Sequence, residues 1–259
     1  MIRKDFNFFY TLALKEGEGL GTAYEYLVKT CLSEKLFKKN EKPENILIAG
    51  LPEKYGYGLD LLFLRNSCNC IIDIVDERDD IIRNFSRILE DLAGSGLLIS
   101  DNIKIKRVER LEDINLNKRY EFCYSSAVLQ RMEGESRVRY LKKLGENVKY
   151  ILLFAPNKEN RAHKEQTGLA GLAAEDLFHY VKEAGIEMFV LGSGKIDLPP
   201  FSPGMRISAQ AKNLIRNKKI GGPVKRFLGG WACFESFLPK FVKNKFAHMV
   251  YLILKLNND

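Results

Sequence analysis

Three glycines and one acidic residue in the first third of the chain have the types and spacing of a nucleoside site. Gly50, Gly56 and Gly58 follow a short apolar run, and glycine lets a backbone bend sharply and approach a ligand closely. Asp76 ends a second apolar run, where a carboxylate can accept hydrogen bonds from a ribose diol. The spacing is not the GxGxxG pattern, which disfavours an oxidoreductase that uses NAD(P). We therefore expect a nucleoside-binding α/β unit over 44–76.

Candidate catalytic side chains are few. His163 follows the expected fifth strand in a loop and is our candidate general base, whereas we expect structural roles for His179 and His248. Neither a Ser/His/Asp constellation nor a GxxxxGK[ST] loop is present, which disfavours hydrolases and P-loop proteins. Cys68 and Cys70 form a C-x-C pair without a second pair or a nearby histidine, so we expect no metal site.

The elements that must position these residues alternate between apolar strands and amphipathic helices from residue 44 onward. This order predicts a Rossmann-like, mostly parallel sheet that binds ligands at the carboxyl ends of its strands. The expected strands are 45–50, 71–75, 103–108, 122–126, 149–155, 187–191 and 248–256. Residues 5–39 read as two helices separated around 17–21, with Thr22 capping the second. We therefore divide the chain into a helical N-terminal cap, 1–43, and an α/β domain, 44–259.

Composition places the chain among ordinary globular proteins. It has 259 residues and 46% hydrophobic content, enough for one large α/β domain. No apolar run approaches the ~20 residues of a membrane span, and the first residues resemble neither a signal peptide nor a transit peptide. The five scattered cysteines indicate reduced thiols, and we expect a cytoplasmic protein.

The net charge of +8 is concentrated near the C-terminus. Between Phe201 and Ala247, ten Lys and Arg residues face the single acid Glu235 and alternate with aromatic residues. Such a segment suits a phosphate-bearing partner, which could be a nucleic acid, a nucleotide-linked metabolite or an anionic membrane surface. The alternative is a solvated lid whose aromatic side chains complete the core.

Four segments, taken in order, resemble the class I S-adenosylmethionine-dependent methyltransferases of the small methyltransferase-domain type. They are ILIAG with its glycine loop, IIDIVDERDDII, YEFCYSSAVLQRMEG and YILLFAPNKENRAH. The resemblance implies a seven-stranded sheet whose last strand is antiparallel and lies beside the fifth, and HMVYLILKL fits that strand. The interval of about 198–247 is then an insertion before it.

The resemblance also assigns roles around the glycine loop. It implies that Gly50, Gly56 and Gly58 wrap the methionine part of S-adenosylmethionine, and that Asp76 binds the adenosine ribose. Glu53 is a candidate for the amino group of the cofactor and equally a solvated loop residue.

Further contacts follow from the later segments. The acid beside the adenine is Glu109, Glu112 or Asp113, and the spacing does not choose among them. Ser125 and Ser126 end the fourth strand beside the expected cofactor. The SSAV sequence there argues against amino methylation of nucleic acids, because those enzymes carry an Asn/Asp-Pro-Pro-aromatic motif.

These observations support two functions. The first is methyl transfer from S-adenosylmethionine to an unidentified acceptor, which the basic insertion predicts to be phosphate-bearing. The second is a non-catalytic module that keeps the fold and uses the basic insertion to bind RNA or an anionic membrane surface. The second is motivated by the loop GLPEKYGYG, in which Pro52, Glu53 and Lys54 intervene before the later glycines.

Overall fold

A computed structural model describes residues 6–39, 43–52, 56–160, 168, 170–200, 222–235 and 237–257. Its sheet has seven strands in the order β3-β2-β1-β4-β5-β7-β6, and β7 runs antiparallel to both of its neighbours. The strands are β1 (Asn45–Ala49), β2 (Ile71–Asp76), β3 (Ile103–Arg107), β4 (Tyr120–Ser126), β5 (Val148–Pro156), β6 (Met188–Ile196) and β7 (Met249–Leu256). The predicted fold class is confirmed, including the antiparallel last strand beside the fifth.

The strands differ in sequence according to how many faces they bury. β1 and β4 lie in the middle of the sheet and are almost continuously buried, as expected of parallel strands that helices cover on both faces. The edge strand β3, IKIKR, alternates instead, with its isoleucines half-buried and its lysines exposed. The predicted strand ranges overlap all seven strands of the structure.

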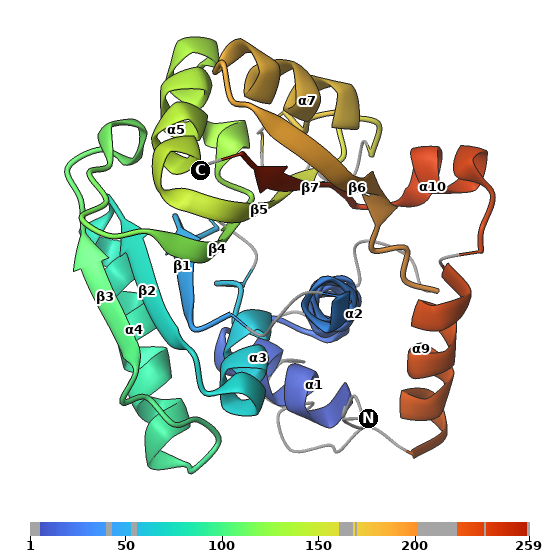
Figure 1. Cartoon of the computed structure of the whole chain (residues 1–259). Coiled ribbons are helices and arrows are strands. Elements are labelled where there is room, and N and C mark those ends of the chain that lie inside the picture. The colour runs from blue at the N-terminus through green and yellow to red at the C-terminus, as the bar shows by residue number, and fades with distance from the viewer. Residues whose placement is uncertain are drawn as a thin grey trace.

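Helices cover both faces of the sheet (Figure 1). One face carries α1 (Phe6–Lys15), α2 (Leu20–Lys39), α3 (Asp60–Cys68) and α4 (Asp79–Gly94), with α9 (Gly222–Glu235) packed against α1 and α2. The other face carries α5 (Gly134–Asn147) and α7 (Ala174–Glu183). The short 3-10 helices η1 (Leu111–Asp113) and η2 (Leu129–Arg131) lie in the loops after β3 and β4. Each face has its own cluster of buried apolar residues.

The two predicted N-terminal helices are present, and α2 lies among α1, α3 and α9 beside the sheet (Figure 1). The predicted cap at Thr22 is wrong, because the carbonyl of Gly19 already accepts the N–H of Ala23 and the helix begins at Leu20. Thr22 lies in the first turn, where its hydroxyl donates to Glu18. The apolar side chains of α1 and α2 join those of β1 and β4 in one cluster.

The predicted insertion before the last strand contains α9 and α10 (Lys240–Phe246). Its residues 201–221, with half of the predicted basic side chains, lie outside the described residues. Within the ranges that the structure describes, no helix is long and apolar enough to cross a membrane.

Candidate functional site

The three predicted glycines of the loop after β1 all have a positive φ, and two of them also leave no room for a Cβ. Gly50 has φ +80°, and a Cβ there would lie 2.7 Å from Val128 Cγ2. Gly56 has φ +50°, and a Cβ there would lie 2.1 Å from the hydroxyl oxygen of Tyr26. Gly58 lies beside Tyr124 and Asp60. The glycines therefore let this loop pack against β4 and α2 at the carboxyl edge of the sheet.

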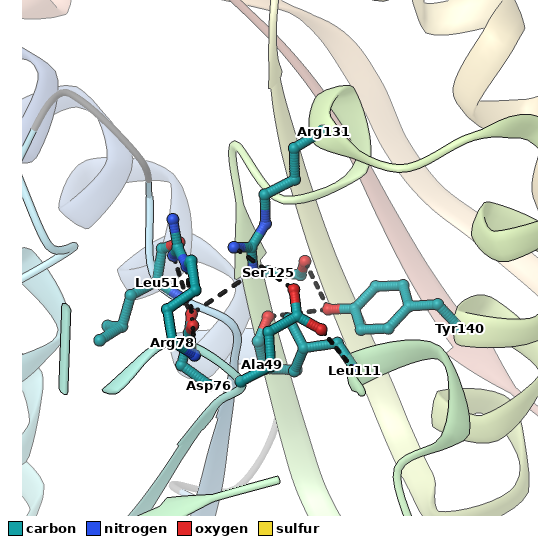
Figure 2. A network of polar contacts seen from close by, with 9 residues as sticks. Ala49, Leu51, Asp76, Arg78, Leu111, Ser125, Arg131 and Tyr140 are labelled. Atoms are coloured by element: carbon teal, nitrogen blue, oxygen red, sulfur yellow. Dashed lines mark hydrogen bonds and ion pairs between the residues drawn. The ribbon is translucent and has the colours of Figure 1, made fainter. Parts of the chain in front are cut away.

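Asp76 ends β2 at the same edge and is 0% exposed. One carboxylate oxygen accepts hydrogen bonds from Arg78 N (3.0 Å) and Nε (2.9 Å). The other accepts from Leu51 N (2.7 Å), Arg78 Nη2 (2.9 Å) and Arg131 Nη2 (3.4 Å) (Figure 2). Burial alone would raise the pKa of Asp76, but Arg78, Arg131 and Leu51 together lower it below its ordinary value. The carboxylate is therefore ionised and its acceptor positions are filled.

Arg78 and Arg131 both bind the Asp76 carboxylate, and we call these two arginines the arginine latch. Arg78 also donates to the carbonyl of Leu51 (2.6 Å), and Arg131 approaches Glu77 (3.7 Å). The latch thus ties the end of β2 to the loop after β1 and to η2. A ligand hydroxyl can bond to Asp76 only by replacing one of these donors.

The two predicted serines at the end of β4 point to opposite faces of the sheet, as neighbours on a strand must. Ser125 Oγ lies 2.8 Å from the hydroxyl oxygen of Tyr140, which donates to the Ala49 carbonyl at 2.8 Å (Figure 2). Ser126 Oγ accepts a hydrogen bond from Lys29 Nζ at 3.0 Å. Ser125 is therefore covered by α5, whereas Ser126 faces α2.

Lys29 is the centre of a buried charged cluster, which we define as Glu25, Lys29, Asp60, Tyr124 and Ser126. Its side chain is 1% exposed, and its ammonium bonds to Glu25 and lies 5.2 Å from the ring centroid of Phe154. The hydroxyl of Tyr124 donates to Asp60 at 3.3 Å. Burial alone would lower the pKa of Lys29, but Glu25 and the other cluster members raise it above its ordinary value. The cluster therefore holds a permanent cation between carboxylates.

Asp60 makes the stability of the fold depend on pH. Burial raises its pKa from 3.8 to about 7, against the opposing charge of Lys29. The folded state therefore binds the proton more tightly than the unfolded state, and this stabilisation is complete below pH 3.8 and is lost as the pH rises through about 7. The full change is about 4 kcal/mol, since each tenfold change in proton affinity is worth about 1.4 kcal/mol.

Asp60→Asn should therefore remove the share of Asp60 in the stability loss that the wild type shows as the pH rises from mildly acidic to mildly alkaline values. Urea unfolding across this range measures the slope of stability against pH. Asp80→Asn, at an exposed position of α4, is the matched control and should keep the wild-type slope. An Asp60→Asn protein with the wild-type slope would contradict the assignment.

Those of the remaining predicted site residues that the structure describes do not all lie together. Glu109 is exposed and, with Asp113, lines a surface pocket of about 420 Å³ after β3. Glu112 is buried, pairs with Arg110 and accepts a hydrogen bond from Ser136, and it does not line this pocket. Glu53 and His163 lie outside the described residues.

A histidine–carboxylate pair lies where β6 ends and β7 begins. His248 Nδ1 is 3.1 Å from Asp197 Oδ2, and the backbone N–H of His248 donates to the Asp197 carbonyl. Burial alone would lower the pKa of His248, but Asp197 raises it, as do Glu25 and Glu235. A carboxylate that holds Nδ1 leaves Nε2 for proton transfer. In the part of the chain that the structure describes, no group of His, Cys, Asp and Glu side chains could hold a metal ion.

Comparison with known proteins adds to this geometry. No protein-family model and no curated protein matches the chain. Among solved structures, the N-methyltransferase NodS from Bradyrhizobium japonicum WM9 matches with a TM-score of 0.54 at 8% identity, covering 89% of this chain and 86% of that chain. Coclaurine N-methyltransferase matches with a TM-score of 0.54 at 14% identity, covering 90% and 73%. The magnesium protoporphyrin IX methyltransferase from Synechocystis PCC 6803 matches with a TM-score of 0.51 at 10% identity, covering 88% and 81%.

The fold is that of the class I methyltransferases. In this chain the α1–α2 pair lies against the sheet, and the α9–α10 pair precedes β7.

Sequence reasoning missed the arginine latch and the charged cluster. The run ERDD directly after β2 contains Arg78, and its position two residues after Asp76 was a usable signal. Lys29 gave no such signal, because Thr22, Tyr26, Lys29 and Ser33 form a polar stripe of α2 that reads as a solvated face. In the structure that stripe is buried.

Proposed function

We propose that this chain is an S-adenosylmethionine-dependent methyltransferase in which Asp76 holds the ribose of the cofactor. The observation that carries the proposal is the place of Asp76, at the carboxyl end of β2 and hydrogen-bonded to the loop after β1. Ligands of open α/β sheets bind at this edge. NodS, coclaurine N-methyltransferase and the magnesium protoporphyrin IX methyltransferase, which share the fold, were each solved with S-adenosylhomocysteine bound.

The arginine latch then competes with the cofactor. A ribose diol needs acceptor positions on Asp76 that the latch already uses. Arg78 is the donor that can leave, because its side chain is 21% exposed whereas that of Arg131 is 10% exposed. We infer that the ribose hydroxyls replace Arg78, while Arg131 and Leu51 N continue to hold the carboxylate.

The remaining task of the protein is positioning. S-adenosylmethionine supplies an activated methyl group, so the chain must align the acceptor with it and exclude water. If the acceptor must lose a proton, His248, which Asp197 orients, is placed to take it. His163 stays a second candidate for the same role. The acceptor itself is unassigned, and a phosphate-bearing molecule stays our prediction from the basic insertion.

Isothermal titration with S-adenosylmethionine and S-adenosylhomocysteine tests the proposal. We expect saturable binding by the wild type and binding about tenfold tighter by Arg78→Gln, because the latch lowers the fraction of binding-competent protein. Arg87→Gln, which changes an exposed arginine of α4, should bind as the wild type does. A lack of binding at millimolar cofactor in both the wild type and Arg78→Gln would exclude the methyltransferase function.

One observation favours a second function, a non-catalytic module with the same fold. Every acceptor position on Asp76 is already matched by a protein donor, as in a purely structural ion pair. The same titration separates the two functions, since a structural latch predicts no cofactor binding even after Arg78 is replaced.

A further inference from the structure

α9, α10 and the turn between them lie at an outer margin of the molecule (Figure 1). Large apolar side chains of these segments are exposed. Phe237 in the turn is 81% exposed, and Phe241 in α10 is 75% exposed. More than half of the surface of Phe227, Phe234 and Phe246 is also exposed. We call these five residues the phenylalanine rim. Several large apolar side chains exposed within one short segment indicate a site of interaction.

The orientation of α9 is fixed by its inward contacts. Leu228 is buried, Trp231 Nε1 donates to the Leu198 carbonyl at 2.7 Å, and Glu235 accepts the Tyr24 hydroxyl at 2.6 Å. The rings of Phe227 and Phe234 pack beside Trp231, with centroid distances of 6.2 and 5.5 Å. Because the inward face of α9 is anchored in this way, its phenylalanines are presented outward by the fold itself.

The segment that carries the rim is basic. Residues 222–247 contain five basic residues and one acid, Glu235, which faces inward. Arg226, Lys240 and Lys245 are exposed, and Lys245 Nζ lies 5.5 Å from the ring centroid of Phe246. The surface therefore combines protruding apolar rings with cations and presents no acid of this segment.

We propose that the phenylalanine rim docks onto the surface of an anionic lipid bilayer. Basic residues attract anionic headgroups, and aromatic side chains enter the boundary between headgroups and acyl chains. Single-stranded RNA also pairs cations with aromatic stacking, but it binds in a groove that follows its backbone. Phe237 and Phe241 protrude from a turn and a helix start instead, which favours insertion into a flat apolar phase.

This inference does not rest on the proposed function. The rim belongs to α9, α10 and their turn, whereas the proposed cofactor contacts lie at the ends of β1, β2 and β4. Vesicle binding and cofactor binding can therefore succeed or fail separately in the same protein.

Flotation of the full chain with lipid vesicles tests the proposal. We expect binding to vesicles of phosphatidylcholine and phosphatidylserine, little binding to phosphatidylcholine alone, and weakening by added salt. Phe237→Ser combined with Phe241→Ser should lower the partition coefficient about tenfold, because less apolar area enters the bilayer. Phe178→Ser combined with Phe189→Ser is the matched control, since these phenylalanines of α7 and β6 are also exposed, and it should bind as the wild type does.

Three results would overturn the proposal. They are no binding of the wild type to anionic vesicles, an equal loss in the control pair, and binding to a single-stranded RNA in place of vesicles. Circular dichroism of each variant shows whether it is folded. Lys240→Glu combined with Lys245→Glu, which should also weaken vesicle binding about tenfold, keeps the test decisive if the serine variant unfolds.

Discussion

Asp76→Asn should abolish cofactor binding and lower the free energy of unfolding by about 3–5 kcal/mol, the usual result of removing one partner of a buried ion pair. The amide would present donors to Arg78 and Arg131, which are donors themselves, and both guanidinium groups would lose their carboxylate. Urea unfolding measures the stability, and titration with S-adenosylhomocysteine measures the binding.

Asp79→Asn is the matched control for this variant. Asp79 lies three residues further along and pairs with Arg107 on the exposed surface, where ion pairs are worth at most about 1 kcal/mol. An Asp76→Asn protein that unfolds like this control would show that the arginine latch does not hold the edge of the sheet. An Asp76→Asn protein that binds cofactor like the wild type would exclude the ribose role.

Lys29→Met should cost about 3–5 kcal/mol of stability at mildly alkaline pH, because Glu25 and Asp60 would lose the cation between them. The loss should shrink as the pH falls, since both carboxyl groups can then become neutral. Burial already raises the pKa of each, and removal of Lys29 takes away an opposing charge in both cases. Urea unfolding at acidic and alkaline pH measures this difference.

The double variant Lys29→Met and Asp60→Asn shows whether the stability loss comes from unbalanced buried charge. If the lysine serves mainly to balance buried charge, the second substitution should recover part of the loss. Lys35→Met, at an exposed position of the same helix, should change stability little. Equal effects of Lys29→Met and Lys35→Met would contradict the charged cluster.

The sheet could be predicted because its physical signal is local. Buried parallel strands require apolar runs, and each run that was predicted to be a strand forms one. The main error in strand length is in β6, which was expected to end at residue 191 but continues to Ile196. The segment GSGK has little strand propensity of its own, and antiparallel pairing with β7 supplies its hydrogen-bond partners.

The candidate site could be predicted only in part, because its electrostatics are set by contacts between distant segments. The sequence indicated Asp76 at the end of an apolar run, but Arg131 reaches it from 55 residues further along. Tyr140 likewise covers Ser125 from a helix on one face of the sheet, whereas Lys29 meets Ser126 from the other. No pattern in a single segment encodes these pairings, so the residues were identified while their partners were not.

A crystal structure of the protein grown with S-adenosylhomocysteine is the decisive test of the role of Asp76. We expect ribose hydroxyls within hydrogen-bond distance of the Asp76 carboxylate and the Arg78 guanidinium displaced from it, with Arg131 still in place. A structure from saturating ligand in which Arg78 still occupies Asp76, and no nucleoside lies at the carboxyl ends of β1 and β2, would contradict it.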